Sequence, residues 1–139
     1  MRAPDPASTG SGRTIPLASI ELVSSAVAEV ETALVEPTSV LRYARAQLAA
    51  RRAAAAVLAA RAQPRRGHRP QNVWQMLPRV APELNEWADF FLATSGHAAA
   101  AQAGISQAVS RREADDMVRD ARKFLDRVIV SLSRGHAAI

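Results

Sequence analysis

The chain of 139 residues contains no cysteine, which excludes disulfide bonds, thiol catalysis and cysteine-ligated metal sites. It has no apolar run near the ~20 residues that span a bilayer, so no membrane contact is expected. The first residues, MRAPDPASTGSGRT, lack the apolar core of a secretory signal. These absences predict a cytoplasmic protein.

Lysine and aromatic residues are scarce. Lys123 is the single lysine among the eighteen basic residues, and only six residues are Phe, Trp or Tyr. Alanine and arginine dominate instead, as is typical of proteins from GC-rich genomes. The formal net charge of +5 permits an anionic partner but does not require one. Abundant alanine with few aromatic residues favours helices that pack closely together.

Composition divides the chain into two parts. Residues 1–16 are rich in Pro, Ser, Gly and Thr, which predicts a disordered N-terminal tail. Residues 17–135 show helical periodicity, and no segment alternates with a period of two, so no strand is expected. We therefore predict an all-α fold, an antiparallel bundle of four main helices plus one short helix.

The first two helices are expected to meet at a proline. A helix from about Pro16 to Val35 ends before Pro37, because the residue before proline avoids helical geometry. Thr38 or Ser39 then caps a second helix, which runs to about Ala62. The predicted apolar face of the first helix is Ile20, Val23, Val27, Val30 and Leu34, and that of the second is Val40, Ala44, Leu48, Arg51, Ala55 and Leu58.

Three further helices are expected in the second half of the chain. Asn72 caps a short helix, NVWQML, which Pro78 ends, and Pro82 begins a third long helix with a break or kink near Gly96. The last helix begins at a capping box, Ser110-Arg111-Arg112-Glu113, and ends near Gly135. Its predicted apolar positions are Ala114, Met117, Val118, Ala121, Phe124, Leu125, Val128, Ile129 and Leu132.

Nine arginines and no acidic residue lie between Pro37 and Pro82. Some share a stripe of the second helix, and others follow in the loop after it. Guanidinium groups bind phosphate oxygens in pairs, which predicts contacts with a nucleic acid or a nucleotide. The residues of this arginine surface are Arg42, Arg45, Arg52, Arg61, Arg65, Arg66 and Arg69.

Ion pairs within the protein explain such a stripe equally well. Glu113, Asp116 and Asp120 of the last helix are candidate partners for the arginines of the second. Arg51 falls within the predicted apolar face. There it needs an acidic partner, faces a second subunit, or extends past alanines to solvent.

No pattern indicates a metal or a cofactor. The three histidines are isolated, without the spacing of metal ligands, and there is no glycine-rich phosphate loop or serine elbow. The aromatic residues Trp74, Trp87, Phe90 and Phe91 lie close together in sequence. Stacking on bases is one interpretation, and a core beneath the short helix is the simpler one.

Three segments, RYARAQLAARRAAAAVLAARAQPR, NVWQMLPRVAPELNEWADFF and SRREADDMVRDARKFLDRV, occur in this order and resemble the actinobacterial branch of the HEPN superfamily. The name stands for higher eukaryotes and prokaryotes nucleotide-binding domains, and the resemblance covers about residues 20–133. It implies a compact bundle of four or five helices that is often dimeric, so we expect a homodimer. Many members are metal-independent ribonucleases with an Arg, four to six residues, and then a His.

Arg61 and His68 match that spacing and are the candidate catalytic pair, with histidine as acid or base and arginine steadying the phosphate. However, the pair straddles Pro64 in a loop, whereas the ribonuclease motif belongs to a later helical part. The resemblance therefore implies a non-catalytic binding or regulatory domain that contacts nucleic acid, a nucleotide or a protein. A ribonuclease and a purely structural protein–protein module are the alternatives.

Overall fold

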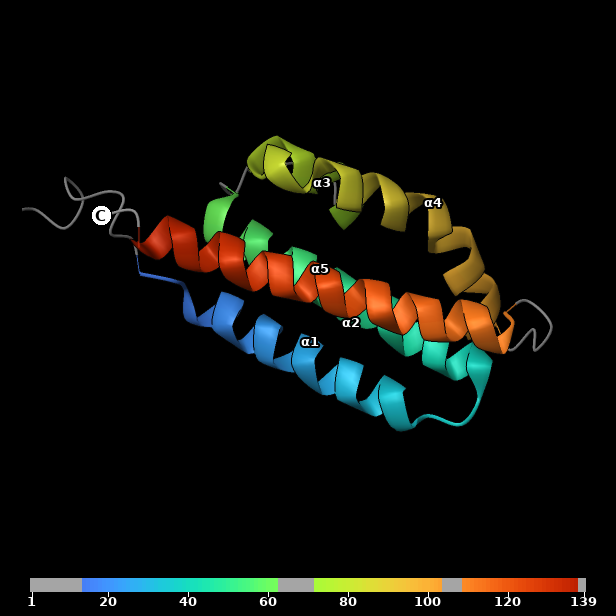
Figure 1. Cartoon of the computed structure of the whole chain (residues 1–139). Coiled ribbons are helices and arrows are strands. Elements are labelled where there is room, and N and C mark those ends of the chain that lie inside the picture. Colours follow the sequence, from blue (N-terminus) through green and yellow to red (C-terminus); the bar gives the residue numbers. More distant parts are fainter. Residues whose placement is uncertain (1–13, 63–71, 104–108, 138–139) are drawn as a thin grey trace, which may run out of the picture.

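The computed structural model describes residues 14–62, 72–103 and 109–137. Within these ranges the protein contains helices and no strand (Figure 1). Four long helices and one short helix are present there, which confirms the predicted all-α fold.

α1 (Leu17–Val35) and α2 (Ser39–Arg61) form the first antiparallel pair. Both helices begin and end close to the predicted residues, with Pro37 between them. Thr38, one of the two residues predicted to cap α2, occupies the N-cap position, but its side chain makes no capping hydrogen bond. Its carbonyl oxygen accepts a hydrogen bond from the Arg42 amide at 2.8 Å.

α3 (Val73–Val80) is the short helix. Asn72 caps it as predicted, because its side chain accepts a hydrogen bond from the Trp74 amide at 2.8 Å. Pro78 does not end the helix, contrary to expectation. Proline removes one amide donor, but the next turn still closes, since the Ala81 amide donates to the Leu77 carbonyl oxygen at 2.9 Å.

A short 3₁₀ turn, η2 (Pro82–Leu84), leads into α4 (Asn85–Gln102). Pro82 therefore begins this turn rather than the long helix itself. α4 continues through Gly96, so no break interrupts it there, and a kink at this residue stays a prediction.

α5 (Arg111–Ala137) begins with the predicted capping box. The Glu113 amide donates to the Ser110 hydroxyl oxygen at 3.0 Å, and the Ser110 amide donates to the Glu113 carboxylate at 3.1 Å. The hydrogen bonds from Ser110 hold the pKa of Glu113 below its usual value. The helix continues past Gly135, so the predicted stop there is wrong.

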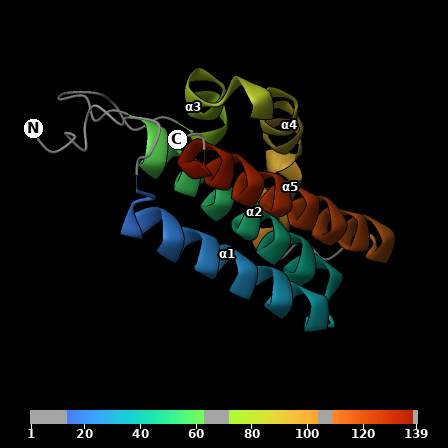
Figure 2. The ribbon, with the colours of Figure 1, turned by 60° about the vertical axis from the view of Figure 1, so that its left-hand side comes forward.

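α2 occupies the centre of the bundle. It packs against α1, α3, α4 and α5, and Figures 1 and 2 show α1 on the opposite side of α2 from α3 and α4. Because neighbours surround α2, residues are buried around most of its circumference. The single apolar face predicted for α2 is therefore wrong: Leu48, Ala55 and Leu58 are only half-buried, whereas Tyr43 and Gln47 are buried.

A cluster of aromatic rings joins α5 to α3 and α4. The ring centre of buried Phe124 lies 5.2 Å from that of Phe91 and 5.7 Å from those of Trp74 and Trp87. Trp74 also stacks on Phe91, with 4.8 Å between ring centres. The predicted core beneath the short helix is confirmed for Trp74 and Phe91, while Phe90 remains 36% exposed.

Replacing Gly96 by alanine is expected to stabilise the protein by about 1 kcal/mol. Gly96 is exposed on α4, and a methyl group there would meet no atom within 4 Å. The change therefore reduces the entropy of the unfolded chain without a clash. The measurement is the urea midpoint of unfolding. Ala93→Gly, at another exposed position of α4, should destabilise by a similar amount, and a Gly96→Ala protein that is less stable than wild type contradicts this prediction.

Candidate functional site

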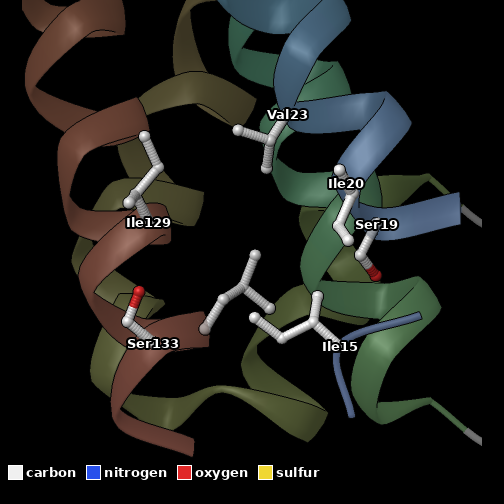
Figure 3. Close-up of a pocket in the computed structure, with 7 residues that line it drawn as sticks. Ile15, Ser19, Ile20, Val23, Ile129 and Ser133 are labelled. Carbon is white, nitrogen blue, oxygen red and sulfur yellow. The ribbon is translucent and has the colours of Figure 1, made fainter. Parts of the chain in front are cut away.

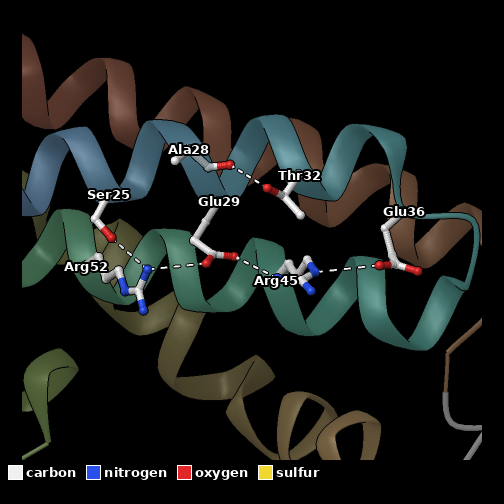
Figure 4. Close-up of polar contacts among 7 residues, drawn as sticks. All are labelled: Ser25, Ala28, Glu29, Thr32, Glu36, Arg45 and Arg52. Carbon is white, nitrogen blue, oxygen red and sulfur yellow. Dashed lines mark hydrogen bonds and ion pairs between the residues drawn. The ribbon is translucent and has the colours of Figure 1, made fainter.

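Glu29 of α1 binds two arginines of α2 (Figure 4). Its carboxylate oxygens lie 3.4 Å from Arg45 Nη1 and 3.3 Å from Arg52 Nη1. A carboxylate oxygen of Glu36 lies 3.6 Å from Arg45 Nε, and the Ser25 hydroxyl accepts a hydrogen bond from Arg52 at 2.6 Å. Two arginines of the predicted phosphate-contacting surface therefore face negative charge supplied by α1.

Arg42 connects α1, α2 and α5. Its Nε and Nη2 donate to the carbonyl oxygen of Glu36 at 3.0 and 2.9 Å, directly after the C-terminal end of α1, where the helix dipole favours a cation. Its Nη1 forms an ion pair with Asp115 of α5. Arg42 therefore acts as a link between three helices.

The acids considered on the last helix have other partners. Asp116 and Asp120 lie 3.2 and 3.7 Å from Arg119 on the same helix, and Glu113 belongs to the capping box. An ion-pair seam does form across the bundle, but its carboxylates are those of Glu29 on α1, Glu36 directly after α1 and Asp115 on α5, and none of the acids considered on the last helix contributes to it.

Arg61 links the end of α2 to η2 and α5. Its Nη1 lies 2.7 Å from Glu83 Oε2, and its Nη2 donates to the hydroxyl and carbonyl oxygens of Ser131 at 2.9 and 3.2 Å. The Ser131 hydroxyl in turn donates to Glu83 at 2.6 Å. Partial burial disfavours the charged form of Glu83, but the hydrogen bonds from Ser131 and Arg61 outweigh it and lower its pKa.

Glu83→Gln is expected to cost about 1 kcal/mol at neutral pH, because this half-exposed carboxylate keeps some solvent screening. The pKa of Glu83 is lower in the folded protein than the usual 4.5. The charge therefore stabilises the fold above that value, and this contribution is lost as pH falls through the folded pKa. Urea unfolding of both proteins from about pH 3 to about pH 7 should show the difference shrinking in acid.

The matched control for that experiment is Glu86→Gln. Glu86 is exposed and has no ion pair with any residue in the described ranges. Its replacement should leave the pH dependence of stability unchanged. A cost of Glu83→Gln that is equal in acid and at neutral pH would contradict the assigned role of the carboxylate.

Arg51 has no ion pair or hydrogen bond with the part of the chain that the structure describes. It is half-buried on α2. The expected acidic partner is thus not found among these residues. Contact with a second subunit and extension to solvent stay as predictions.

A polar cluster lies where α2, α4 and α5 meet. Buried Gln47 donates to Thr94 Oγ1 at 2.7 Å, and the rings of Tyr43 and His97 are 5.8 Å apart. Burial raises the pKa of Tyr43, and His97 Nε2 lies 3.6 Å from a carboxylate oxygen of Glu113. These contacts join polar side chains of α2, α4 and α5 to one another, which is a structural role. In the described ranges no three His, Asp or Glu side chains come close enough to hold a metal ion.

The remaining candidates from the loop, Arg65, Arg66, Arg69 and His68, lie outside the described residues. The structure thus brings Arg42, Arg45 and Arg52 together against α1, and it places Arg61 apart from them, against η2 and α5. The geometry between Arg61 and His68 falls outside the described part.

The type of domain follows from comparison with protein families. The model of the HEPN_SAV_6107-like HEPN family matches residues 33–129, more than half of the chain. The chain belongs to the HEPN superfamily. This confirms the resemblance to the HEPN superfamily found in the sequence, while its actinobacterial branch stays a prediction. Among curated proteins and among solved structures, no significant match exists.

Several large apolar residues of α1 in this HEPN domain point outward. Leu17, Ile20, Val27 and Leu34, which we call the outer face of α1, are 68%, 53%, 37% and 50% exposed. The apolar face predicted for the first helix is therefore wrong for three of its five residues. The buried side is built from Ser19, Ala26, Val30 and Ala33.

Small residues explain this orientation of α1. They let α1 approach α2 closely enough for the Ser19 hydroxyl to donate to the backbone carbonyl oxygen of Ala56 at 2.8 Å.

On α5, Ile129 and Val130 are also exposed, at 38% and 39%. Among the helices of the described ranges, none has the length and apolar character needed to cross a membrane. Sequence reasoning missed this surface, although Leu17 and Leu22, off the predicted stripe, signal apolar residues on more than one side of the helix.

Proposed function

We propose that this HEPN domain is a non-catalytic binding domain whose ligand is a protein. The observation that carries this proposal is the outer face of α1, a row of exposed apolar residues along one helix. Rows of this kind are typical of surfaces that another protein covers. The described arginines of the arginine surface, in contrast, already pair within the domain.

Site-specific cross-linking tests this proposal. A photoreactive benzophenone amino acid placed at Leu34, which is 50% exposed, should form covalent adducts with a protein in cells of the native host. The same group at Gln75, an exposed position on α3, is the control and should give few adducts. Absence of protein adducts from Leu34 overturns the proposal.

Nucleic-acid or nucleotide binding by the arginine surface is the second candidate. Its support is that Arg45 and Arg52 keep 40% and 36% of their side chains exposed despite their ion pairs with Glu29. Each guanidinium has five N–H donors, so a phosphate can still be contacted.

Freeing these arginines provides the test of that candidate. Glu29→Gln removes the shared carboxylate, so binding to a mixed RNA pool should strengthen and depend more steeply on salt. Replacing Arg65 and Arg66 together by alanine should weaken binding across all sequences and lower the salt slope by about one for each lost phosphate contact. If neither variant changes RNA or DNA affinity, the arginine surface is not a polyanion site.

Ribonuclease activity is not part of this proposal, because the guanidinium of Arg61 is held by Glu83 and Ser131. We expect the wild-type protein to leave RNA intact in the same gels. Cleavage by wild type that disappears in His68→Ala would overturn the non-catalytic assignment.

A further inference from the structure

An open pocket lies between the beginning of α4 and the first half of α5. Its volume is about 300 Å³, at the lower end of pockets that take small ligands. The backbones of α4 and α5 make little direct contact within the described ranges, so side chains of the two helices enclose space between them. The described residues that line this α4–α5 pocket are two aromatic residues and two acids: Glu86, Trp87 and Phe90 of α4 and Asp120 of α5.

Both aromatic side chains of the α4–α5 pocket are held by the core on one part of the ring only. Trp87 is half-buried, and its ring centre lies 6.1 Å from that of Phe91 and 5.7 Å from that of Phe124. Phe90 is 36% exposed, and its ring meets Phe91 edge on, with 5.0 Å between ring centres. The core therefore fixes both rings, while a part of each lines the pocket. The face of an aromatic ring is electron-rich and attracts a cation.

The two carboxylates of the pocket keep capacity for a further partner. Glu86 is exposed and has no ion pair within the described ranges. Asp120 lies 3.7 Å from Arg119 Nε, a long contact for an ion pair, and Arg119 Nη1 is closer to Asp116, at 3.2 Å. α4 itself carries two acids and no lysine or arginine. A cation in the pocket would therefore displace little of the existing pairing.

This lining favours an organic ammonium ion over a metal ion. Calcium and magnesium need about six oxygen ligands and stay partly hydrated where the protein supplies few of them. Two carboxylates beside two aromatic rings do not provide such a set. A methylated ammonium group, in contrast, can rest its methyl groups on the ring faces while the carboxylates balance its charge.

A second pocket has a different lining. It lies between α1 and α5, where Ile20 and Val23 of α1 face Ile129 of α5 (Figure 3). The described residues that line it are aliphatic residues and two serines, and these offer a cation neither charge nor an aromatic ring. The combination of rings and carboxylates therefore distinguishes the α4–α5 pocket from an ordinary apolar hollow.

We propose that the α4–α5 pocket binds a methylated ammonium ion, through cation–π contacts with Trp87 and Phe90 and through the charges of Glu86 and Asp120. This site goes beyond the proposed function, because Figures 1 and 2 show α4 on the opposite side of α2 from α1. A free small amine and the methylated lysine side chain of another protein both present this cation.

Choline is the first probe, and NMR of the indole N–H groups of the full chain is the measurement. The protein has two tryptophans, and Trp87→Phe assigns their signals. Choline should shift the Trp87 signal saturably, with a dissociation constant in the millimolar range. The signal of Trp74, which is buried, should stay in place.

The uncharged analogue of choline, in which carbon replaces nitrogen, is the control ligand. It has the same shape without the charge, so it should bind at least ~5-fold more weakly. An analogue that binds as tightly as choline overturns the proposal, because the pocket would then take any apolar group of this size. Absence of a saturable shift up to ~100 mM choline overturns it as well.

Variants of the lining test the assigned residues. Glu86→Gln, Asp120→Asn and Phe90→Ala should each raise the dissociation constant of choline ~2–5-fold, the effect of one exposed charge or one ring. Asp126→Asn is the matched control, since Asp126 is an exposed acid of α5 that does not line the pocket, and it should leave binding unchanged. Circular dichroism would verify that the variants keep their helices. Equal weakening by Asp126→Asn and Asp120→Asn, or unchanged binding in Phe90→Ala, contradicts the assignment.

A peptide with one trimethylated lysine separates the two sources of the cation. Binding ~10-fold tighter than that of choline, and weakened by Phe90→Ala, supports a side chain of another protein as the ligand. Binding no tighter than that of choline supports a free amine. Failure of the pocket to bind either probe leaves the proposed function in place, because cross-linking from Leu34 tests the outer face of α1 separately.

Discussion

Phe124→Ala is expected to destabilise the protein by about 3–5 kcal/mol, the largest effect of any single truncation proposed for this fold. The side chain of Phe124 is fully buried, and its ring contacts those of Phe91, Trp74 and Trp87. The backbones of α4 and α5 make little direct contact within the described ranges. The rings therefore form most of the connection between α5 and the α3–α4 pair, and alanine would leave a cavity there.

Urea unfolding followed by circular dichroism measures this cost. Phe90→Ala is the matched control, because Phe90 is 36% exposed and its ring meets Phe91 alone among the described aromatic residues. It should cost less, about 1 kcal/mol, because part of its side chain is already in solvent. Equal costs for the two variants would show that the ring cluster does not hold α5 in place.

The elements with clear periodicity could be predicted from the sequence. In α5, eight of the nine expected apolar positions are buried, and Ile129 is the exception at 38% exposure. The capping box at Ser110 could also be predicted, because its hydrogen bonds join residues only three apart in the chain. Local signals of this kind do not depend on how the helices pack.

The packing of α1 and α2 could not be predicted in this way. Alanine is buried and exposed with nearly equal ease, so the run of alanines in α2 does not show which side faces the core. The actual answer, burial around most of the helix, depends on the number of neighbours around α2. On α1 the small residues Ser19, Ala26 and Ala33 are buried and let the helix pack closely against α2. The residues of the outer face of α1 therefore point outward.

The candidate site could likewise be predicted only in part. Helical spacing placed Arg42, Arg45 and Arg52 on one stripe. In the structure Arg45 and Arg52 contact the Glu29 carboxylate of α1, and Arg42 contacts the carbonyl oxygen of Glu36 directly after α1. Spacing within one helix cannot show which neighbouring helix covers that stripe. For this reason Glu29, which joins Arg45 to Arg52, was missed, and acids of the last helix were considered in its place.

Ala53→Leu is expected to destabilise the protein by about 3 kcal/mol, the upper end of the usual cost of overpacking. Ala53 is 0% exposed in the middle of α2, the helix that packs against all four others. Leucine and alanine have similar helix propensities, so the backbone preference changes little. The added side chain would have to push α2 away from a neighbouring helix, and every contact along that pair would loosen.

Ala59→Leu separates this steric effect from a general effect of leucine on α2. Ala59 is an exposed position of the same helix, so the substitution is identical and the space around it is open. Its urea midpoint should stay close to that of wild type, while the midpoint of Ala53→Leu falls. If both variants match wild type, the alanines of α2 do not set the distance between the helices. The outward orientation of the large apolar residues of α1, which follows from that close approach, would then need another cause.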